Sequence, residues 1–211
     1  MKIRWIGHAA FYIETADGLK IRTDPYDPSI GLPTSDLPAD VVTVSHSHYD
    51  HSAVETVPGD PMVIDSPDRR TVQGATIRGV QAFHDELRGA KRGTDIIFVI
   101  SADGVTLAHA GDLGHPLTKA QLDQLGAVDI LCLPVGGVYT LDAKQATAAA
   151  DAINPKIVIP MHYSLPGLQF KLAAVEPFLE GKKAVRRLDE LEVVASAMPA
   201  DYEVVVLKPR P

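Results

Sequence analysis

Short apolar runs bounded by turn-forming residues dominate the first half of the chain. Runs of this kind, rich in Val and Ile, predict β-strands. The strands predicted there are Ile3–Ile6, Phe11–Glu14, Leu19–Thr23, Val41–Val44, Met62–Ile64 and Thr76–Val80. Further along, the pattern predicts helices over Thr118–Leu125, Asp142–Ala152 and Phe170–Leu179, and strands over Asp129–Leu133, Lys156–Pro160 and Glu203–Leu207. Asp142 is the expected N-cap of an Ala-rich helix.

Two features of this pattern occur twice. Asp-Gly lies between apolar runs at Asp17-Gly18 and again at Asp103-Gly104, a signal that favours β-hairpins. The runs that begin at Val41 and at Lys156 each end on a histidine, His46 or His162. We therefore predict one domain over residues 1–211, built from two similar halves of about 1–95 and 96–211 that pack face to face.

The densest chemical signal is the run His46-Ser47-His48-Tyr49-Asp50-His51. In an extended segment His46 and His48 project to the same side, so both can reach one metal ion. Asp50 and His51 lie beyond the expected turn and can reach a second ion. Imidazole and carboxylate ligands suit zinc, iron or manganese. The competing interpretation is a solvated polar loop, which three histidines in six residues make a poor explanation.

Three further candidate ligands each follow a predicted strand: His84, Asp112 and His162. Taken singly, each is better explained as a surface residue or a hydrogen-bonded polar residue than as a ligand. Because all three end strands, we expect them to gather at one edge of the fold. Asp112 follows Gly111, and glycine lets the backbone turn closely beside a site.

The order His46-x-His48-x-Asp50-His51, then His84, Asp112 and His162, resembles the metallo-β-lactamase fold superfamily. Four further segments look like one branch of it, the small metal-dependent hydrolases related to ascorbate-6-phosphate lactonase and N-acyl-phosphatidylethanolamine phospholipase D. These segments are Trp5–Phe11, Thr23–Pro25, Pro134–Thr140 and Pro155–Tyr163.

The resemblance implies an α/β (α+β) fold, a four-layer αββα sandwich, and two divalent ions. It assigns the first ion to His46, His48 and His84, the second ion to Asp50, His51 and His162, and the bridging position to Asp112. Zinc is favoured, with manganese or iron as alternatives. It also implies that Asp24 supports a ligand imidazole from behind; an Asp that starts a loop before Pro25 is an equally good interpretation.

The expected activity is that of a metal-dependent hydrolase. A hydroxide bridging the two ions would attack a small ester, lactone or phosphodiester, and Asp50 would act as both ligand and proton shuttle. Two alternatives stay open: a di-iron oxidoreductase and a non-catalytic metal-binding module of the same fold. The candidate pocket residues are His8, His115 and Tyr139. His109 is as easily a packed strand residue as a site residue.

Composition narrows the partners. The chain has 211 residues, 45% of them hydrophobic, and a net charge of −7. The acidic balance argues against a nucleic-acid partner, which would need a basic footprint. Two short basic clusters, Lys91-Arg92 and Lys182-Lys183 with Arg186-Arg187, are interpreted as solvated surface. No apolar run approaches the ~20 residues of a membrane span and no signal peptide is visible, so we expect a cytoplasmic protein with a small-molecule substrate. A homo-oligomer is possible. The single cysteine, Cys132, is expected in the core.

Overall fold

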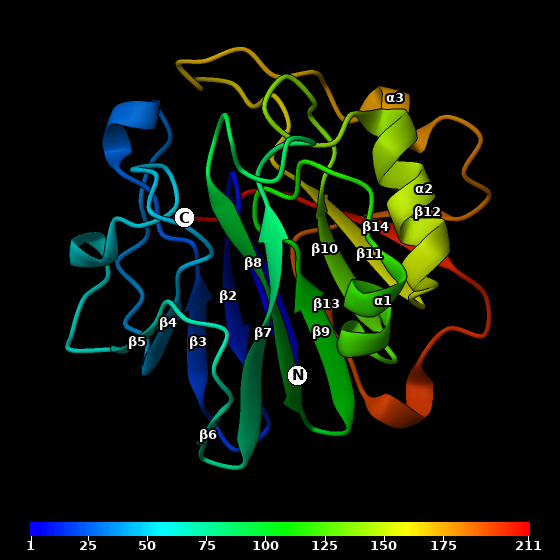
Figure 1. Cartoon of the computed structure of the whole chain (residues 1–211). Helices are drawn as coiled ribbons and strands as arrows, with labels where there is room; N and C mark the ends of the chain where they lie inside the picture. Colours follow the sequence, from blue (N-terminus) through cyan, green and yellow to red (C-terminus); the bar gives the residue numbers. More distant parts are fainter.

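The computed structural model describes residues 1–211 as two β-sheets packed face to face (Figure 1). The smaller, six-stranded sheet has the order β13-β1-β2-β3-β4-β5. Its strands are β1 (Lys2–Gly7), β2 (Ala10–Glu14), β3 (Lys20–Thr23), β4 (Val41–Thr43), β5 (Met62–Ile64) and β13 (Leu191–Glu192). The larger, eight-stranded sheet has the order β12-β14-β11-β10-β9-β8-β7-β6. Its strands are β6 (Arg70–Val72), β7 (Ala75–Phe83), β8 (Thr94–Ala102), β9 (Val105–His109), β10 (Ile130–Pro134), β11 (Ile157–Met161), β12 (Val185–Leu188) and β14 (Glu203–Leu207).

The α-helices lie on the outer side of the larger sheet (Figure 1). They are α1 (Lys119–Leu125), α2 (Ala143–Ile153) and α3 (Glu176–Leu179). The first two confirm their predictions, and both start with a capping box, at Thr118 and Asp142. The helix predicted over Phe170–Leu179 was wrong in its first half. Pro177 lacks an N–H and fits only the first helical turn, so α3 cannot start much before it.

Alternating side chains divide the smaller sheet into an inner and an outer face. On β1 and β2, Trp5 and Phe11 point into the main core between the sheets, whereas Ile6 and Tyr12 point outward. Two short 3-10 helices, η1 (Pro28–Ile30) and η2 (Val54–Thr56), and the loops around them cover that outer face; η3 (Ala195–Ala197) precedes β14. The predicted sandwich is therefore confirmed, but the layer outside the smaller sheet consists of turns and loops.

Both predicted hairpins are present. β2 pairs antiparallel with β3, and β8 pairs antiparallel with β9. In the second hairpin Asp103 and Gly104 have φ of 57° and 72°, the left-handed pair that a two-residue hairpin loop requires. The larger sheet already begins at β6 and β7, before residue 95, and the division into two similar halves stays a prediction.

Strand direction brings the candidate residues together. In the larger sheet β7, β9, β10 and β11 run the same way, because β8 is antiparallel to β7 and β9 while β9, β10 and β11 are mutually parallel. In the smaller sheet β1, β3 and β4 likewise share a direction. The segments that follow these strands therefore emerge at one edge of each sheet. The two edges meet there, since His51 after β4 contacts Asp112 after β9.

Candidate metal centre

Asp112 lies at the middle of the histidine cluster. Its carboxylate is buried, and each oxygen faces different imidazoles. Oδ2 lies 3.0 Å from His84 Nε2 and 4.0 Å from His46 Nε2. Oδ1 lies 3.2 Å from both His51 Nε2 and His162 Nε2. One carboxylate is thus shared between two groups of imidazoles.

Each group is completed by one more residue of the motif after β4. On one side, His48 Nδ1 lies 3.0 Å from His46 Nε2, and His84 is close to both. On the other side, Asp50 Oδ2 lies 3.7 Å from His51 Nε2. The seven predicted ligands lie in three overlapping groups, in each of which the possible ligand atoms are within 4.8 Å of one another. The groups are His46, His48 and His84; His46, His51 and Asp112; and Asp50, His51 and His162 together with His8.

Unpaired polar atoms show that these clusters suit a metal ion. His51 Nε2 and Asp112 Oδ1 are both buried without a hydrogen-bond partner although they face each other. His51 Nδ1 is engaged by Asp24, so in the neutral ring Nε2 carries a lone pair. Two lone pairs that face each other in a buried place need a cation between them, either a proton or a metal ion. The donor set of imidazole and carboxylate fits a divalent transition metal.

Burial and neighbouring charges shift the pKa values of the candidate ligands in different directions. Burial lowers the pKa of His46 to about 3, so its ring is neutral at neutral pH. Burial would by itself raise the pKa of Asp112, but His162 and His51 outweigh it and hold that pKa well below its usual value. Burial likewise opposes the charged form of His51, and the Asp112 and Asp24 carboxylates overcome it and raise its pKa.

Asp24 lies directly behind His51. Its carboxylate is fully buried and accepts three hydrogen bonds: from Ser45 N (2.8 Å), from Ser45 Oγ (2.6 Å) and from His51 Nδ1 (2.9 Å). A buried carboxylate in this position fixes both the tautomer and the orientation of the imidazole.

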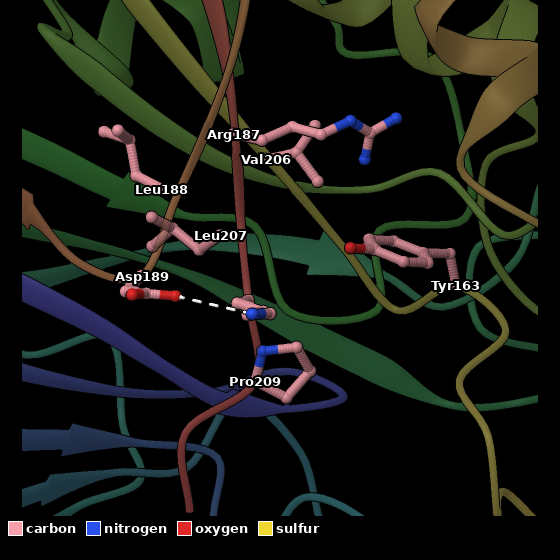
Figure 2. Close-up of a pocket in the computed structure, with 8 residues that line it drawn as sticks. Tyr163, Arg187, Leu188, Asp189, Val206, Leu207 and Pro209 are labelled. Atoms are coloured by element: carbon pink, nitrogen blue, oxygen red, sulfur yellow. Dashed lines mark ion pairs between the residues drawn. The ribbon is translucent and has the colours of Figure 1, made fainter.

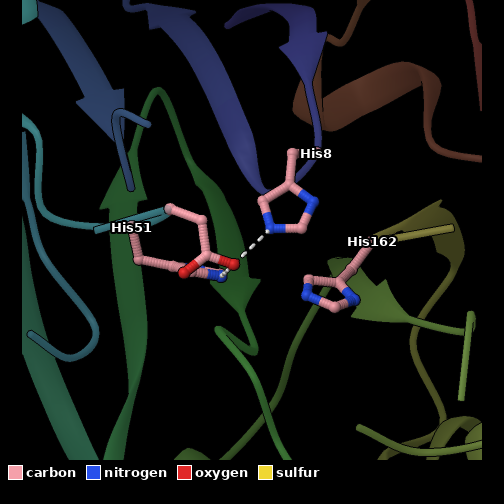
Figure 3. A group of neighbouring side chains, drawn as sticks. His8, His51 and His162 are labelled. Atoms are coloured by element: carbon pink, nitrogen blue, oxygen red, sulfur yellow. Dashed lines mark hydrogen bonds and ion pairs between the residues drawn. The ribbon is translucent and has the colours of Figure 1, made fainter. Parts of the chain in front are cut away.

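His8 reaches the same side of the cluster from the β1–β2 turn. Figure 3 shows its ring converging with those of His51 and His162. Its Nε2 lies 3.2 Å from Asp50 Oδ2, and its φ of 52° is unusual for a residue with a Cβ. Burial lowers its pKa to about 4, so His8 is neutral at neutral pH, and its Nε2–H donates to the Asp50 carboxylate, whose own pKa this hydrogen bond helps to lower although burial opposes it.

The family model of the beta-lactamase superfamily domain matches residues 2–162 of the chain. The chain belongs to the metallo-β-lactamase superfamily. Among relatives of this superfamily, it is 30% identical to an Archaeoglobus fulgidus "UPF0173 metal-dependent hydrolase", over 99% of this chain and 96% of the relative. A protein with the same name from Carboxydothermus hydrogenoformans is 32% identical, over 78% of this chain and 85% of the relative.

Solved structures give the same result for the metallo-β-lactamase fold. A Thermotoga maritima protein of this superfamily, to which zinc-dependent hydrolysis has been ascribed, matches with a TM-score of 0.82 and 42% identity, over 98% of this chain and 97% of that one. A metallo hydrolase from Ignicoccus hospitalis matches with a TM-score of 0.70 and 24% identity, over 99% and 95% of the two chains. The second likeness shows the fold alone.

A pocket of about 350 Å³ opens onto the histidine cluster around Asp112. Its lining combines five candidate metal ligands with an arginine and three aromatic side chains: His48, Tyr49, Asp50, His84, Arg92, Asp112, Tyr139, His162 and Phe170. Arg92 is half-buried here, which corrects the sequence interpretation of Lys91-Arg92 as plain solvated surface. The loop between β7 and β8, closed by a hydrogen bond from His84 N to Gly93 O, brings Arg92 to the pocket, and the run of basic residues in the sequence does not reveal this.

Figure 2 shows a larger hollow, of about 570 Å³, beside β12 and β14. Tyr163, Arg187 and Pro209 are among its lining residues, and its one ion pair joins Lys208 Nζ to Asp189 Oδ1 at 3.9 Å. It contains no histidine and none of the predicted ligands. Its size alone therefore gives it no chemistry, and the smaller pocket is the candidate site.

Two of the remaining histidines lie outside this pocket. His115 Nε2 accepts a hydrogen bond from Phe83 N (3.2 Å) and its Nδ1 donates to Pro116 O (2.8 Å), so both ring nitrogens serve the backbone. The structure thus places His115 in a different hollow, lined also by Phe83 and Asp85, rather than in the pocket with the metal ligands. His109 is a buried strand residue whose Nε2 lies 2.8 Å from Ala9 O.

No helix has the length and apolar character to cross a membrane.

Sequence reasoning missed one acidic residue at the centre. Asp95 opens β8 at the same edge, fully buried, and its Oδ1 accepts from Asp112 N (3.1 Å) and lies 3.6 Å from His46 Nδ1. Burial and the nearby Asp112 carboxylate raise its pKa well above the usual value. An Asp at the start of an otherwise apolar strand was the available signal. Gly111, at φ 50°, leaves no space for a Cβ between Asp95 and Ser45.

Proposed function

We propose that the protein is a metal-dependent hydrolase with a binuclear site that Asp112 bridges. The observation that carries this proposal is the divided environment of the Asp112 carboxylate. Its Oδ2 faces His84 and its Oδ1 faces both His51 and His162, at 3.0–3.2 Å. Two ions that share one carboxylate are the usual basis of two-metal hydrolysis.

The remaining ligands divide between the two positions. The first set is His46, His48 and His84, and the second set is Asp50, His51 and His162, which His8 adjoins. Bound there, the ions would supply a polarised substrate oxygen and a water activated near neutral pH. Zinc is the favoured ion, because the donor set suits it and because zinc dependence has been ascribed to the Thermotoga maritima relative. Manganese and iron are the alternatives.

The protein's own side chains orient the ligands and handle protons. Asp24 holds His51 Nδ1–H, which leaves Nε2 free to coordinate. Asp50 Oδ2 faces His8 while part of the side chain lines the pocket, so this carboxylate can pass a proton to a leaving group. The pocket volume of about 350 Å³ lies at the small end for ligand sites, which fits a small ester, lactone or phosphodiester.

The test combines metal analysis, an optical spectrum and a turnover screen. The protein would be purified without added metal, then assayed with zinc, manganese or iron against lactones, phosphodiesters and thioesters. We expect about two ions per chain and hydrolysis of at least one class. Bound iron with an absorbing centre and redox turnover would favour a di-iron oxidoreductase instead. Bound metal without any turnover would favour a non-catalytic module.

The Asp112→Asn variant tests the bridge itself. We expect a folded protein with reduced metal content and no hydrolysis, because an amide is a poor bridging ligand. Asp123→Asn is the matched control: this carboxylate is exposed, pairs only with Lys119 and should leave metal content unchanged. Near-normal turnover in Asp112→Asn would contradict the bridging role.

A further inference from the structure

The wall of the pocket beside the metal ligands is aromatic and carries one cation. The rings of Tyr139 and Phe170 meet nearly at right angles, with centroids 6.1 Å apart. The guanidinium carbon of Arg92 lies 5.6 Å from the centre of the Tyr139 ring. Arg92 is the only lysine or arginine that lines this pocket. The wall therefore offers an apolar corner, formed by two aromatic rings, next to a positive charge.

The Arg92 guanidinium has no carboxylate partner. The arginines that form ion pairs are Arg4, Arg70, Arg186 and Arg187. The one hydrogen bond from the Arg92 side chain is a long one, from Nη2 to a backbone carbonyl at 3.4 Å. A guanidinium has five N–H donors in a planar fork, so most of them stay available.

The backbone that carries Arg92 is held in place by a buried carboxylate. Asp85 accepts hydrogen bonds from four backbone N–H groups of the loop that follows it: Leu87 (2.8 Å), Gly89 (3.0 Å), Lys91 (2.9 Å) and Arg92 (2.7 Å). These bonds lower the pKa of Asp85 although burial opposes them, so it stays ionised as the centre of the loop. A donor on such a loop is preorganised, which reduces the entropy lost when a ligand binds.

The same loop is tied to the metal centre. His84 N donates to Gly93 O at 3.1 Å, so the residue after Arg92 is fixed beside a proposed metal ligand. Both ends of the loop are therefore held, and the Arg92 side chain lines the pocket beside Tyr139.

We propose that Arg92 binds an oxyanion, a carboxylate or a phosphate, on the substrate, away from the bond that is cleaved. The apolar part next to this group lies against Tyr139 and Phe170. The substrate class is then a small anionic ester, lactone or phosphodiester with an apolar portion. This assignment rests on the proposed hydrolase function, whose metal ions would face the other end of the same pocket.

The test measures binding of matched small probes to the zinc-loaded protein by calorimetry. Benzoate and phenyl phosphate carry the two oxyanions, and benzamide is the neutral counterpart. We expect at least one anion to bind about tenfold or more tightly than benzamide. Arg92→Gln should remove at least a tenfold part of that affinity, about 1.4 kcal/mol, and leave benzamide unchanged. The anion whose binding depends on Arg92 identifies the source of the charge.

Two further variants keep the result interpretable. Lys91→Gln removes the same charge from the neighbouring exposed residue and should change nothing. Arg92→Lys keeps the charge without the planar fork and should give an intermediate affinity. All variants should fold, because the backbone N–H of residue 92, rather than its side chain, completes the Asp85 loop.

The outcomes separate this inference from the proposed function. Equal anion binding by wild type and Arg92→Gln, or no preference of the wild type for either anion over benzamide, would overturn the role of Arg92. Turnover of neutral esters could continue in that case, and the hydrolase proposal would stand. Conversely, Arg92-dependent anion binding in a protein that hydrolyses nothing would support the anion site and sink the hydrolase proposal.

Discussion

Asp24→Asn is the substitution that most directly tests how the fold prepares a metal ligand. The Asp24 carboxylate receives three donors, two from Ser45 and one from His51 Nδ1. An asparagine keeps one oxygen and replaces the other with an NH₂ donor. If the amide faces His51 with its nitrogen, His51 Nδ1 must become the acceptor and the proton must move to Nε2. Because Nε2 is the atom 3.2 Å from Asp112 Oδ1, the ring then loses the lone pair that would bind the ion.

The opposite orientation of the amide is also unfavourable. Its NH₂ would then face Ser45 N–H, which donates to Asp24 Oδ1 at 2.8 Å. Two donors would face each other in a buried place, and an unsatisfied buried donor costs ~1–3 kcal/mol. Loss of a carboxylate behind a metal-binding histidine typically lowers metal affinity ~10–100-fold, or ~1.4–2.7 kcal/mol. We therefore expect weaker zinc binding and a moderately less stable fold.

The assay is competition for zinc with a chromophoric chelator, alongside urea unfolding of the metal-free protein. Asp129→Asn is the matched control, because its carboxylate also accepts a backbone hydrogen bond, from Thr106 N at 2.8 Å, but lies at the start of β10, on the opposite edge of the sheet. It should lose stability and keep its zinc affinity. Zinc affinity of Asp24→Asn within about threefold of wild type would refute the tautomer argument.

Three further predictions concern the same centre. Removing metal with a chelator should lower the melting temperature and stop any hydrolysis reversibly. Restoring free zinc to a hundred times its dissociation constant should add ~2.7 kcal/mol to the free energy of unfolding, which raises the melting temperature by about 5–11 °C for a domain of this size. An unchanged melting curve would contradict metal binding to the folded state. Gly111→Ala places a Cβ against Asp95 and Ser45 at a left-handed φ, so it should lower the free energy of unfolding in urea by ~2–4 kcal/mol. Gly18 is also left-handed but faces open space, so Gly18→Ala should lower it by only about 1 kcal/mol. Equal losses in the two variants would contradict the packing argument. In His8→Asn the asparagine suits the left-handed backbone but is too short to reach Asp50 Oδ2. The zinc affinity of one of the two sites should therefore fall about tenfold in a competition titration. Unchanged affinity at both sites would show that His8 does not position Asp50.

Local sequence predicted the elements whose signals are short-range and strong. The hairpin at Asp103-Gly104 follows from backbone conformations that Gly and Asp adopt at low cost. The helix after Asp142 follows from its cap and its alanines. The strands that escaped prediction, β6, β12 and β13, are edge or very short strands with many exposed polar side chains. Their apolar periodicity is weak because one or both faces meet solvent.

The run His46–His51, and the position of the other candidate ligands after strands, can be predicted from the sequence. How these residues combine depends on the fold, because sheet order and the contact between the two sheets involve residues far apart in the chain. That arrangement turned Asp24 from a possible loop residue into the partner of His51. It also brought in Asp95 and Arg92, which no local pattern connects to the histidines, and left His115 outside. Short segments of sequence reveal which residues could bind a metal, whereas the distances between these residues are set by packing across the whole core.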